Sequence, residues 1–317
     1  METKQVKVVV SALALAMMVL LAIVSQAADP PQGTPVDGDI GLLADDPRTA
    51  ISSTRTISSP GSYYLTGDLQ TSSGNSNAIH IDADNVTLDL MGFSLIGQGS
   101  GTGNGILISG QANVEIRNGT VRDFGGCGIL ENSQENGVGH RVIEVRTMFN
   151  VEGGIYLDGS NHLVRDSVAL VNGAVGIAAG NSSTVINSRS SINFGFGVLC
   201  MSGTISSNTV EFNLLHGIAI VDKSVVTNNK VNNNSEGIYI DGDGSLIKCN
   251  TLAENIENNI HVNGSHNVIE ENFVYNSNRG IRFEQGGNFY ANNRASENGT
   301  NYSNTSGNNN GGGNVSF

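Results

Sequence analysis

The feature that most constrains this chain is an internal repeat of about 21 residues. The pattern Gly-Ile-x-Ile, or a close variant, recurs with its first positions 23, 26, 22, 21, 20, 20, 22 and 21 residues apart. The copies begin at Gly105, Gly128, Gly154, Gly176, Gly197, Gly217, Gly237, Asn259 and Gly280, and an earlier variant begins at Ala78. Because a unit this short cannot bury a core of its own, neighbouring units must stack.

Two columns of asparagine run in phase with this pattern. The first column contains Asn208, Asn229, Asn250, Asn272 and Asn293. The second lies five residues further along and contains Asn172, Asn193, Asn213, Asn234, Asn255 and Asn298. We expect these residues to mark corners, since asparagine tolerates the left-handed conformation of a sharp corner. Stacked asparagine side chains can also hydrogen-bond from one unit to the next.

The repeat therefore predicts an all-β fold, a parallel β-solenoid of about nine to ten coils with an N-terminal cap. Each coil has short strands whose side chains alternate between core and solvent, and coils lie about 4.8 Å apart. The composition agrees, because Gly and Asn supply 41 and 40 of the 317 residues and Pro only 5. A leucine-rich repeat would instead show Leu-x-x-Leu-x-Leu, and a propeller would need a longer repeat.

The ends of the chain differ from the repeat. Residues 1–27 have two lysines, an apolar stretch and the small-residue site Ser25-Gln26-Ala27, which is typical of a secretory signal. A retained membrane anchor is the alternative. Residues 28–56 are expected to be a leader, 57–297 the β-helix domain, and 298–317 a flexible tail rich in Asn, Gly and Ser. Cleavage predicts a secreted or periplasmic protein without a membrane segment.

The charge of the chain bears on its partners. The formal net charge is −13, and removal of Glu2, Lys4 and Lys7 with the signal leaves 14 basic and 28 acidic residues, a net charge of −14. Such a surface disfavours nucleic acid and anionic lipid. A local arginine cluster can still bind an acidic polysaccharide. Three cysteines, an odd number, argue against a disulfide framework.

Residues 57–297 resemble the right-handed parallel β-helix superfamily with pectin-lyase-like architecture. The resemblance rests on the Gly-Ile-x-Ile copies, the asparagine columns and the stretches Asn85–Phe93 and Val114–Val121. It implies a right-handed solenoid. Members include polysaccharide lyases, glycoside hydrolases, sugar epimerases, phage tailspikes and a periplasmic copper-delivery protein, so the resemblance alone does not select an activity. The Asp-Pro-His-Glu motif of alginate epimerases and the motif set of polygalacturonases are absent from the sequence.

A charged stretch is the candidate catalytic region. Residues 115–166 hold five of the 14 mature cations. Glu144 and Arg165 are expected to be outward neighbours on adjacent coils, with Arg117 one coil earlier. A uronate lyase or epimerase needs a cation for the substrate carboxylate and a base for the proton at C5. We assign Arg117 and Arg165 to the first role and His162 to the second. A solvated charge ladder between coils is the alternative.

Acidic residues at the ends of the repeated strands are weak candidates for a metal site. Asp158, Asp241 and Glu284 each lie three residues after the strand isoleucine, and Asp243 follows closely. Their hard oxygen ligands suit calcium, whereas the simpler interpretation is an exposed acidic turn. Tyr156 and Tyr239 are expected to point outward, where sugar rings or a covering loop can pack on them.

The sequence thus predicts an exported β-helix that binds or processes polysaccharide, lyase- or epimerase-like, on an outer face of the solenoid. The alternatives are a non-catalytic surface or structural solenoid and a periplasmic accessory protein of the copper-delivery type. Extra residues within 78–105 and 128–154 lie beside the charged stretch, so we expect any cleft wall there. The oligomeric state is left open.

Overall fold

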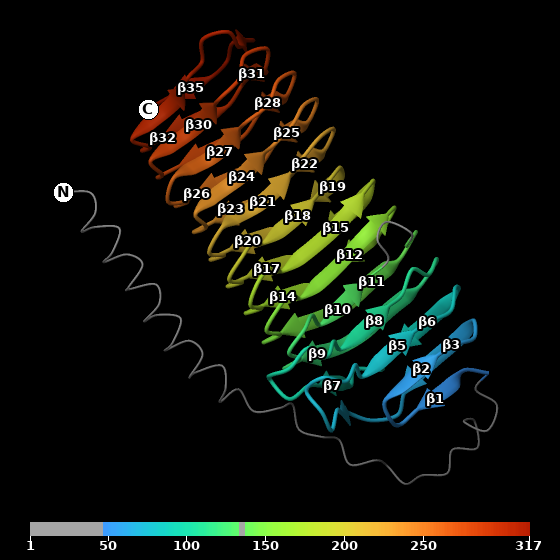
Figure 1. Ribbon diagram of the computed structural model, residues 1–317. Helices are drawn as coiled ribbons and strands as arrows, with labels where there is room; N and C mark the ends of the chain where they lie inside the picture. Colours follow the sequence, from blue (N-terminus) through green and yellow to red (C-terminus); the bar gives the residue numbers. More distant parts are fainter. Residues whose placement is uncertain (1–46, 133–136) are drawn as a thin grey trace, which may run out of the picture. The chain divides into compact units, whose positions relative to one another are not determined.

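The computed structural model describes residues 47–132 and 137–317, and in them the chain winds into a parallel β-helix (Figure 1). One face is a 12-stranded sheet, here called sheet B, in which each strand pairs in parallel with the strand of the next turn. Its strands are β2 (Arg55–Ile57), β5 (Ile79–Ile81), β8 (Ile106–Ile108), β10 (Ile129–Glu131), β12 (Ile155–Ser160), β15 (Ile177–Asn181), β18 (Val198–Cys200), β21 (His216–Ile220), β24 (Glu236–Ile240), β27 (Asn258–Val262), β30 (Arg279–Phe283) and β33 (Thr300–Ser303).

The other strands form one 23-stranded sheet, sheet A, which bends around two sides of each turn. In most turns two strands of sheet A follow one of sheet B, but β9 and β11 run through both sides. The strands before the middle of the stack are β1 (Thr49–Ile51), β3 (Gly61–Leu65), β4 (Leu69–Gln70), β6 (Val86–Asp89), β7 (Ser94–Ile96), β9 (Glu115–Arg122), β11 (Arg141–Met148), β13 (Leu163–Arg165), β14 (Val168–Leu170), β16 (Ser183–Ile186) and β17 (Arg189–Ser191). The later strands are β19 (Gly203–Ser206), β20 (Thr209–Glu211), β22 (Val225–Thr227), β23 (Lys230–Asn232), β25 (Leu246–Lys248), β26 (Thr251–Ala253), β28 (Val268–Glu270), β29 (Phe273–Tyr275), β31 (Phe289–Ala291), β32 (Arg294–Ser296), β34 (Asn309–Asn310) and β35 (Val315–Ser316).

The all-β prediction is confirmed, and the coil count is corrected from nine or ten to about twelve. The additional turns lie at the ends, where the sequence lacks Gly-Ile-x-Ile. At the first of them Arg55–Ile57 pairs with β5, and at the last Tyr302 stands where Ile281 stands one turn earlier. No helix within the described ranges is long and apolar enough to span a membrane.

The predicted domain limits also differ from the structure. Strand β1 falls within the predicted leader 28–56, β2 runs past its end to Ile57, and β33, β34 and β35 fall within the predicted flexible tail 298–317. In that tail Asn308 accepts a hydrogen bond from the Asn288 N–H, and Asn314 accepts one from the Asn293 N–H. The asparagine hydrogen bonds therefore extend into the last turn, which has few apolar residues. The predicted signal at 1–27 lies outside the described residues and stays a prediction.

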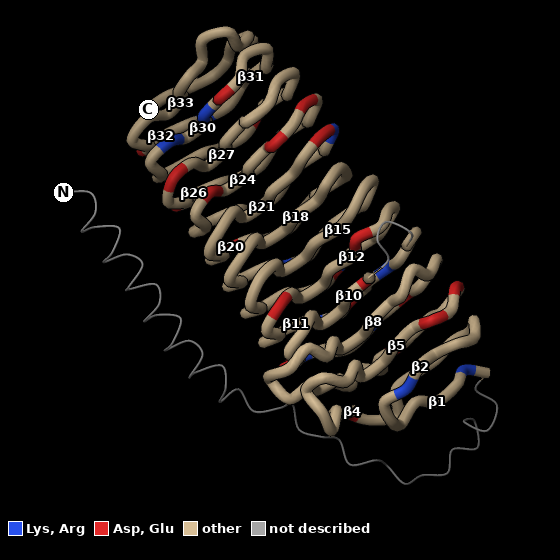
Figure 2. Tube along the Cα trace, viewed as in Figure 1, with Lys and Arg blue, Asp and Glu red and all other residues tan. Residues whose placement is uncertain are grey.

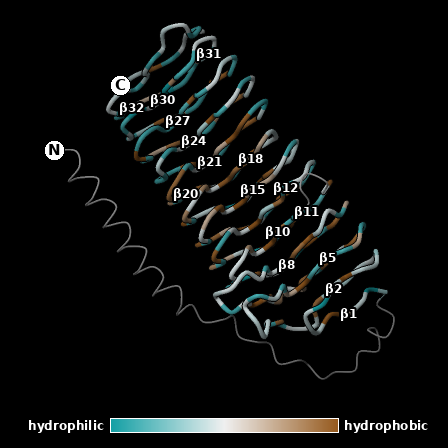
Figure 3. The backbone as a smooth tube through the Cα atoms, in the orientation of Figure 1, coloured by the Kyte–Doolittle hydropathy of each residue, from teal (hydrophilic) through white to brown (hydrophobic). Residues whose placement is uncertain are grey.

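The core is a stack of aliphatic columns, as the repeat predicts. The isoleucines and valine that follow the repeated glycine are at most 1% exposed and pair in register from turn to turn. They are Ile106, Ile129, Ile155, Ile177, Val198, Ile218, Ile238, Ile260 and Ile281. Figure 3 shows apolar positions recurring along successive turns. The inward side of every strand is thereby occupied, and chemistry must use the outer faces or the corners.

Hydrogen bonds between side chain and backbone hold the corners together. The Asn208 backbone N–H and side-chain amide both donate to Asn229 Oδ1, at 2.9 and 3.0 Å, and Asn229 donates in the same way to Asn250. The left-handed residue is the one before each ladder asparagine, such as Ser207 with φ 58° and Asn228 with φ 58°. This corrects the expectation that the column asparagines themselves are left-handed. The preceding residue turns the chain, and the asparagine side chain then points inward.

Replacing one ladder asparagine tests this account. Asn229→Ala removes the acceptor for two donors of Asn208, which are buried, and we expect a loss of about 3 kcal/mol in the free energy of unfolding. Thr227→Ala, at a half-buried outward position, is the matched control with an expected effect below about 0.5 kcal/mol. Urea unfolding followed by circular dichroism measures both, and equal stabilities of the two variants would contradict the ladder's role.

Candidate functional site

The two arginines of the predicted site share one column on sheet A. Arg117 and Arg165 are both level with Ile143, which lies in the turn between them. Arg117 forms ion pairs with Asp89 at 3.1 Å and Glu115 at 3.3 Å, and Arg165 pairs with Asp166 at 3.1 Å. Their side chains are 41% and 47% exposed, so both guanidinium groups reach solvent while paired.

Glu144 does not occupy the predicted position beside Arg165. The step between these two turns is 22 residues, so Arg165 is level with Ile143. Glu144 is the left-handed corner residue, with φ 56°. It lines a shallow pocket of about 310 Å³ with Arg146 and Asp166. Glu144 therefore lies near Arg146, whereas the sequence had indicated Arg165 as its neighbour.

His162 is not on the outer face at all. It lies inside the solenoid, where its ring stacks on His140 with centroids 5.0 Å apart. Both Nε2 atoms face Glu131, at 3.6 Å from His140 and 3.2 Å from His162. Glu131 itself replaces an inward aliphatic residue, since it pairs with Ile108 in the preceding turn. A base so enclosed cannot reach a polysaccharide, and this corrects the assignment of His162.

The buried trio of Glu131, His140 and His162 is, within the described residues, the group whose atoms lie close enough to share a metal ion. Their hydrogen bonds argue against a metal. His140 Nδ1 accepts from the Val114 N–H at 3.2 Å, and His162 Nδ1 accepts from the His140 N–H at 3.1 Å. The proton of each neutral ring must then be on Nε2, which leaves no lone pair there for a ligand bond. The two Nε2 atoms face the Glu131 carboxylate but form no hydrogen bond with it.

The carboxylates proposed for calcium are also not gathered together. Asp158 and Asp241 occupy equivalent positions but are separated by several turns, with Leu157 pairing to Ala179 and Ile240 to Ile220. Asp241 accepts from the Asn263 amide at 2.9 Å and Asp243 from the Ser265 N–H at 2.7 Å. Glu284 forms ion pairs with His261 and Arg282. Hydrogen-bonding partners thus take the place that a shared cation would have.

A second group of ionisable residues lies on the outer face of sheet B, where β21, β24, β27 and β30 meet. Glu236 is 5% exposed and contacts two histidines, His261 Nδ1 at 3.0 Å and His216 Nδ1 at 3.4 Å. The Tyr239 ring lies between these histidines, with centroids 4.7 Å from His216 and 5.1 Å from His261. We call these four residues the acid–base cluster.

Electrostatics separate the two histidines of the acid–base cluster. Burial lowers the pKa of His216 below its ordinary value, and the charge of Glu236 offsets this only in part. Burial would also lower the pKa of His261, but its hydrogen bonds to Glu236 and Glu284 outweigh burial and raise that pKa. Burial would raise the pKa of Glu236, yet the bond and charge of His261 and the Asn258 amide keep it low. The two imidazoles that flank this carboxylate therefore differ, since the surroundings of His216 favour its neutral form and those of His261 its protonated form.

Sequence reasoning missed this cluster because its members come from two columns of the repeat. His216 and Glu236 both stand just before the repeated glycine and are level in adjacent turns, whereas Tyr239 and His261 lie on the outward side of the strand. His216 looked like no more than a residue preceding the repeat's glycine. The available signal was the spacing of 20 between His216 and Glu236 and of 22 between Tyr239 and His261.

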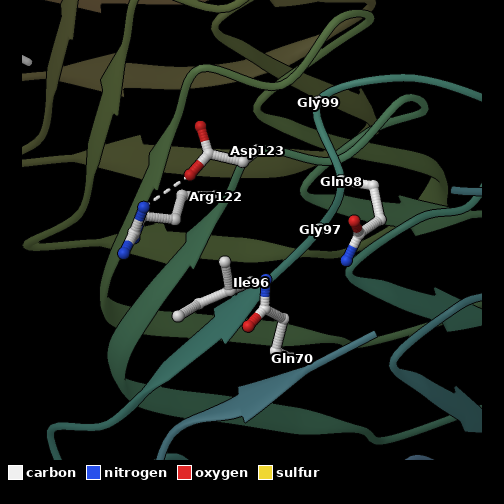
Figure 4. Close-up of a pocket in the computed structure, with 7 residues that line it drawn as sticks. All are labelled: Gln70, Ile96, Gly97, Gln98, Gly99, Arg122 and Asp123. Atoms are coloured by element: carbon white, nitrogen blue, oxygen red, sulfur yellow. Dashed lines mark hydrogen bonds and ion pairs between the residues drawn. The ribbon is translucent and has the colours of Figure 1, made fainter. Parts of the chain in front are cut away.

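A further pocket lies near the N-terminal end of the stack. It has a volume of about 470 Å³ and is lined by Gln70, Ile96, Gly97, Gln98, Gly99, Arg122 and Asp123 (Figure 4). Arg122 and Asp123 form an ion pair across 2.5 Å, so their charges are mutually satisfied. Its remaining lining is backbone, aliphatic side chain and amide, without a second titratable pair. The acid–base cluster is accordingly the stronger candidate for chemistry.

Comparisons with known proteins agree with this geometry. The family described as right handed beta helix region matches residues 104–252. The fold of this chain is a right-handed parallel β-helix. Among solved structures, this β-helix is similar to the A-module of mannuronan C-5 epimerase AlgE6 of Azotobacter vinelandii, with a TM-score of 0.74 and 14% identity over 85% of this chain and 88% of that chain.

Two other solved structures have the same fold. The A-module of mannuronan C-5 epimerase AlgE4 of Azotobacter vinelandii matches with a TM-score of 0.64 and 13% identity over 80% of this chain and 86% of that one. The enzymatically active domain of tailspike protein 2 of bacteriophage CBA120 matches with a TM-score of 0.50 and 12% identity over 73% of this β-helix and 42% of that chain. At such identities the likeness concerns the fold. A comparison with curated protein sequences found no match.

The buried trio provides a stability test. Glu131→Leu removes the carboxylate that the two buried Nε2 atoms face and the acceptor of the Gly159 N–H, so we expect a loss of about 1–3 kcal/mol in the free energy of unfolding. The triple variant Glu131→Leu, His140→Asn, His162→Asn should regain most of it, because asparagine supplies the ladder acceptor and leucine matches Leu157 in the next turn. Thermal unfolding measures both. A midpoint raised by added zinc would contradict the proton assignment.

Proposed function

We propose that this protein binds and processes polysaccharide on the outer face of sheet B, with proton transfer carried out by the acid–base cluster. The observation that carries the proposal is Glu236, a nearly buried carboxylate held between two histidines whose pKa values shift in opposite directions. Shifted titratable groups gathered on a face are typical of active sites. The named activity of the two similar A-modules, epimerisation of mannuronan, supports a glycan as the substrate.

Each member of the cluster has a distinct role. His216, whose pKa is lowered, acts as the general base, and His261, whose pKa is raised by its hydrogen bonds to Glu236 and Glu284, acts as the general acid. Glu236 is a positioning residue that orients both rings and stabilises the imidazolium. Tyr239 lies between the two rings, stacked on His216 and in an edge contact with His261, and so fixes their separation.

On a uronate polymer this arrangement suits a lyase or an epimerase. His216 would take the proton at C5, and His261 would return a proton to the leaving oxygen or to the opposite face of the sugar ring. Arg282 is the nearest cation for the substrate carboxylate, although Glu284 already pairs with it. Arg117 and Arg165 lie on sheet A and stay a separate proposal for binding anionic groups there, with Glu144 at the neighbouring corner as a separate catalytic candidate.

Neutralising Glu236 tests the assignment. Glu236→Gln removes the charge that keeps His261 protonated, and we expect kcat/KM to fall by about 100-fold or more. Glu270→Gln, a carboxylate paired with Lys248 on sheet A, is the matched control and should leave activity unchanged. A panel of polysaccharides is scored for new reducing ends and for the ultraviolet absorbance of unsaturated products. Equal activity of both variants would remove the cluster from the mechanism.

The pH profile tests the two roles separately. Activity should fall on the acid side as His216 gains a proton, with a limb below pH 6.5, the ordinary histidine value. It should fall on the basic side as His261 loses its proton, with a limb above pH 6.5. Residual activity of His261→Gln should lack the basic limb. The measurement is kcat/KM against pH, and an unchanged basic limb in that variant would refute the role of His261.

A further inference from the structure

The outer face of sheet B changes character along the stack. In register with Tyr239, the outward residues of the preceding turns form an uncharged row. We call this row the apolar track; it consists of Leu130, Tyr156, Ala178, Leu199 and Ala219. Five turns separate Leu130 from Tyr239, which is roughly 24 Å at 4.8 Å per turn.

A second uncharged row runs beside the track and ends at the acid–base cluster. Val175 and Phe196 each precede the repeated glycine, as His216 does in the next turn. The ring of Phe196 lies 5.3 Å from that of His216. At the far end the track opens into an apolar pocket of about 360 Å³ formed by Cys127, Leu130, Glu152, Gly153, Tyr156, Ala174 and Val175. The two rows thus connect this pocket with the acid–base cluster.

The charges around the track are carboxylates. Glu152 lines the pocket, the charge of Asp158 acts on Tyr156, and Tyr239 donates to Asp241 at 3.5 Å. Glu257 acts on His216, and Glu284 pairs with His261. Figure 2 shows charged positions sparse over β15 and β18, with acidic positions near β24.

Cations are placed elsewhere. The arginines of the charged stretch lie on sheet A, in β9, β11 and β13, and Arg189 pairs with Glu211 on the same sheet. On sheet B, Arg279 and Arg282 lie at β30, two turns past Tyr239, which follows the end of the track at Ala219. Arg282 is level with His261 and already pairs with Glu284. Lys223 lies in the turn after β21. A polyuronate on the track would therefore place a carboxylate on every sugar beside acidic groups and without a cation.

We propose that the ligand of the track is a neutral polysaccharide, lying along the solenoid axis with its reacting sugar at the acid–base cluster. This inference rests on the proposed function and specifies its substrate. The C–H faces of uncharged pyranose rings can pack on Tyr156 and Leu199, while their hydroxyl groups reach the polar rim. The occupant is thus complementary to the apolar track, whose residues carry no charge.

A neutral sugar also fixes the reaction class. Without a carboxylate at C5 there is no acidic proton to remove, so elimination and C5 epimerisation are excluded for this substrate. Hydrolysis is the reaction that one acid and one base can perform with water. His261 gives its proton to the glycosidic oxygen as the C1–O bond breaks. The water oxygen bonds to C1, and its proton passes to His216.

Two other ligands of the apolar track are alternatives to a neutral polysaccharide: an acidic polysaccharide and a second copy of the chain. An acidic polysaccharide would need cations that the track does not provide. A second copy of the chain would need to cover a long uncharged strip of a protein with a net charge of −13. Each has a distinct experimental signature, so one experiment can separate them from a neutral glycan.

The test is affinity electrophoresis of the full chain in gels containing neutral glycans (xylan, glucomannan, β-glucan) or acidic ones (alginate, polygalacturonate), at 20 and 200 mM salt. We expect retardation in a neutral gel that is insensitive to salt. Tyr156→Ala should weaken binding about tenfold. Leu199→Arg should weaken it further and create salt-sensitive binding to an acidic glycan. Thr209→Arg, outward on sheet A, is the matched control and should leave the retardation unchanged.

The outcomes distinguish the substrate inference from the proposed function. Salt-sensitive retardation of the unmodified protein by an acidic glycan alone, with unsaturated products, overturns the neutral substrate and leaves acid–base processing intact. Absence of retardation and of products with every glycan overturns both. A doubled mass in light scattering that Leu199→Arg abolishes assigns the track to a second copy. If Tyr156→Ala or Leu199→Arg lowers the unfolding midpoint, the binding measured with the other variant is used to judge the inference.

Discussion

The structure depends on one recurrent hydrogen bond, in which a corner side chain accepts from the backbone N–H of the preceding turn. At two corners the acceptor is mostly asparagine, as in the pairs of Asn208 with Asn229 and Asn213 with Asn234. At the third it is Ser245 Oγ in one turn and Asn267 Oδ1 in the next. Since these bonds lie inside, each turn is closed without help from its outward residues. Outward positions are then free to differ between turns.

This freedom explains how a site can arise on so regular a scaffold. Strand pairing places residues of successive turns side by side, so a cluster needs no loop to gather it. His216, Tyr239 and His261 belong to three successive turns, yet their rings are in contact. The same pairing that stacks Ile218, Ile238 and Ile260 inside therefore stacks titratable groups outside. The candidate site on sheet B is therefore formed by the identity of the outward residues in successive turns, and not by a loop or a cleft.

The sequence predicted the inside of this molecule better than the outside. The isoleucine column could be read directly, because a buried position repeats the same residue type in every turn. Glu144 was misplaced by one residue, since a single step of 22 shifts a charged residue from strand to corner. His162 was misassigned because its Nδ1 can replace the oxygen of a ladder asparagine or serine. The acid–base cluster was missed because polar outward residues do not repeat, and only the register brings them together.

The two clusters of two histidines with a glutamate show why position decides chemistry. Around Glu131 both Nδ1 atoms accept from backbone N–H groups, so neither ring can take a second proton without breaking a ladder bond. Around Glu236 the nitrogens of His261 face two carboxylates, at 3.0 and 3.1 Å, an arrangement that stabilises the imidazolium. Identical side chains therefore act as acceptors for the backbone inside the solenoid and as partners of carboxylates on its face. The two clusters differ in the partner of the histidine Nδ1 atom. That partner is a backbone N–H group for His140 and His162, and a carboxylate for His261.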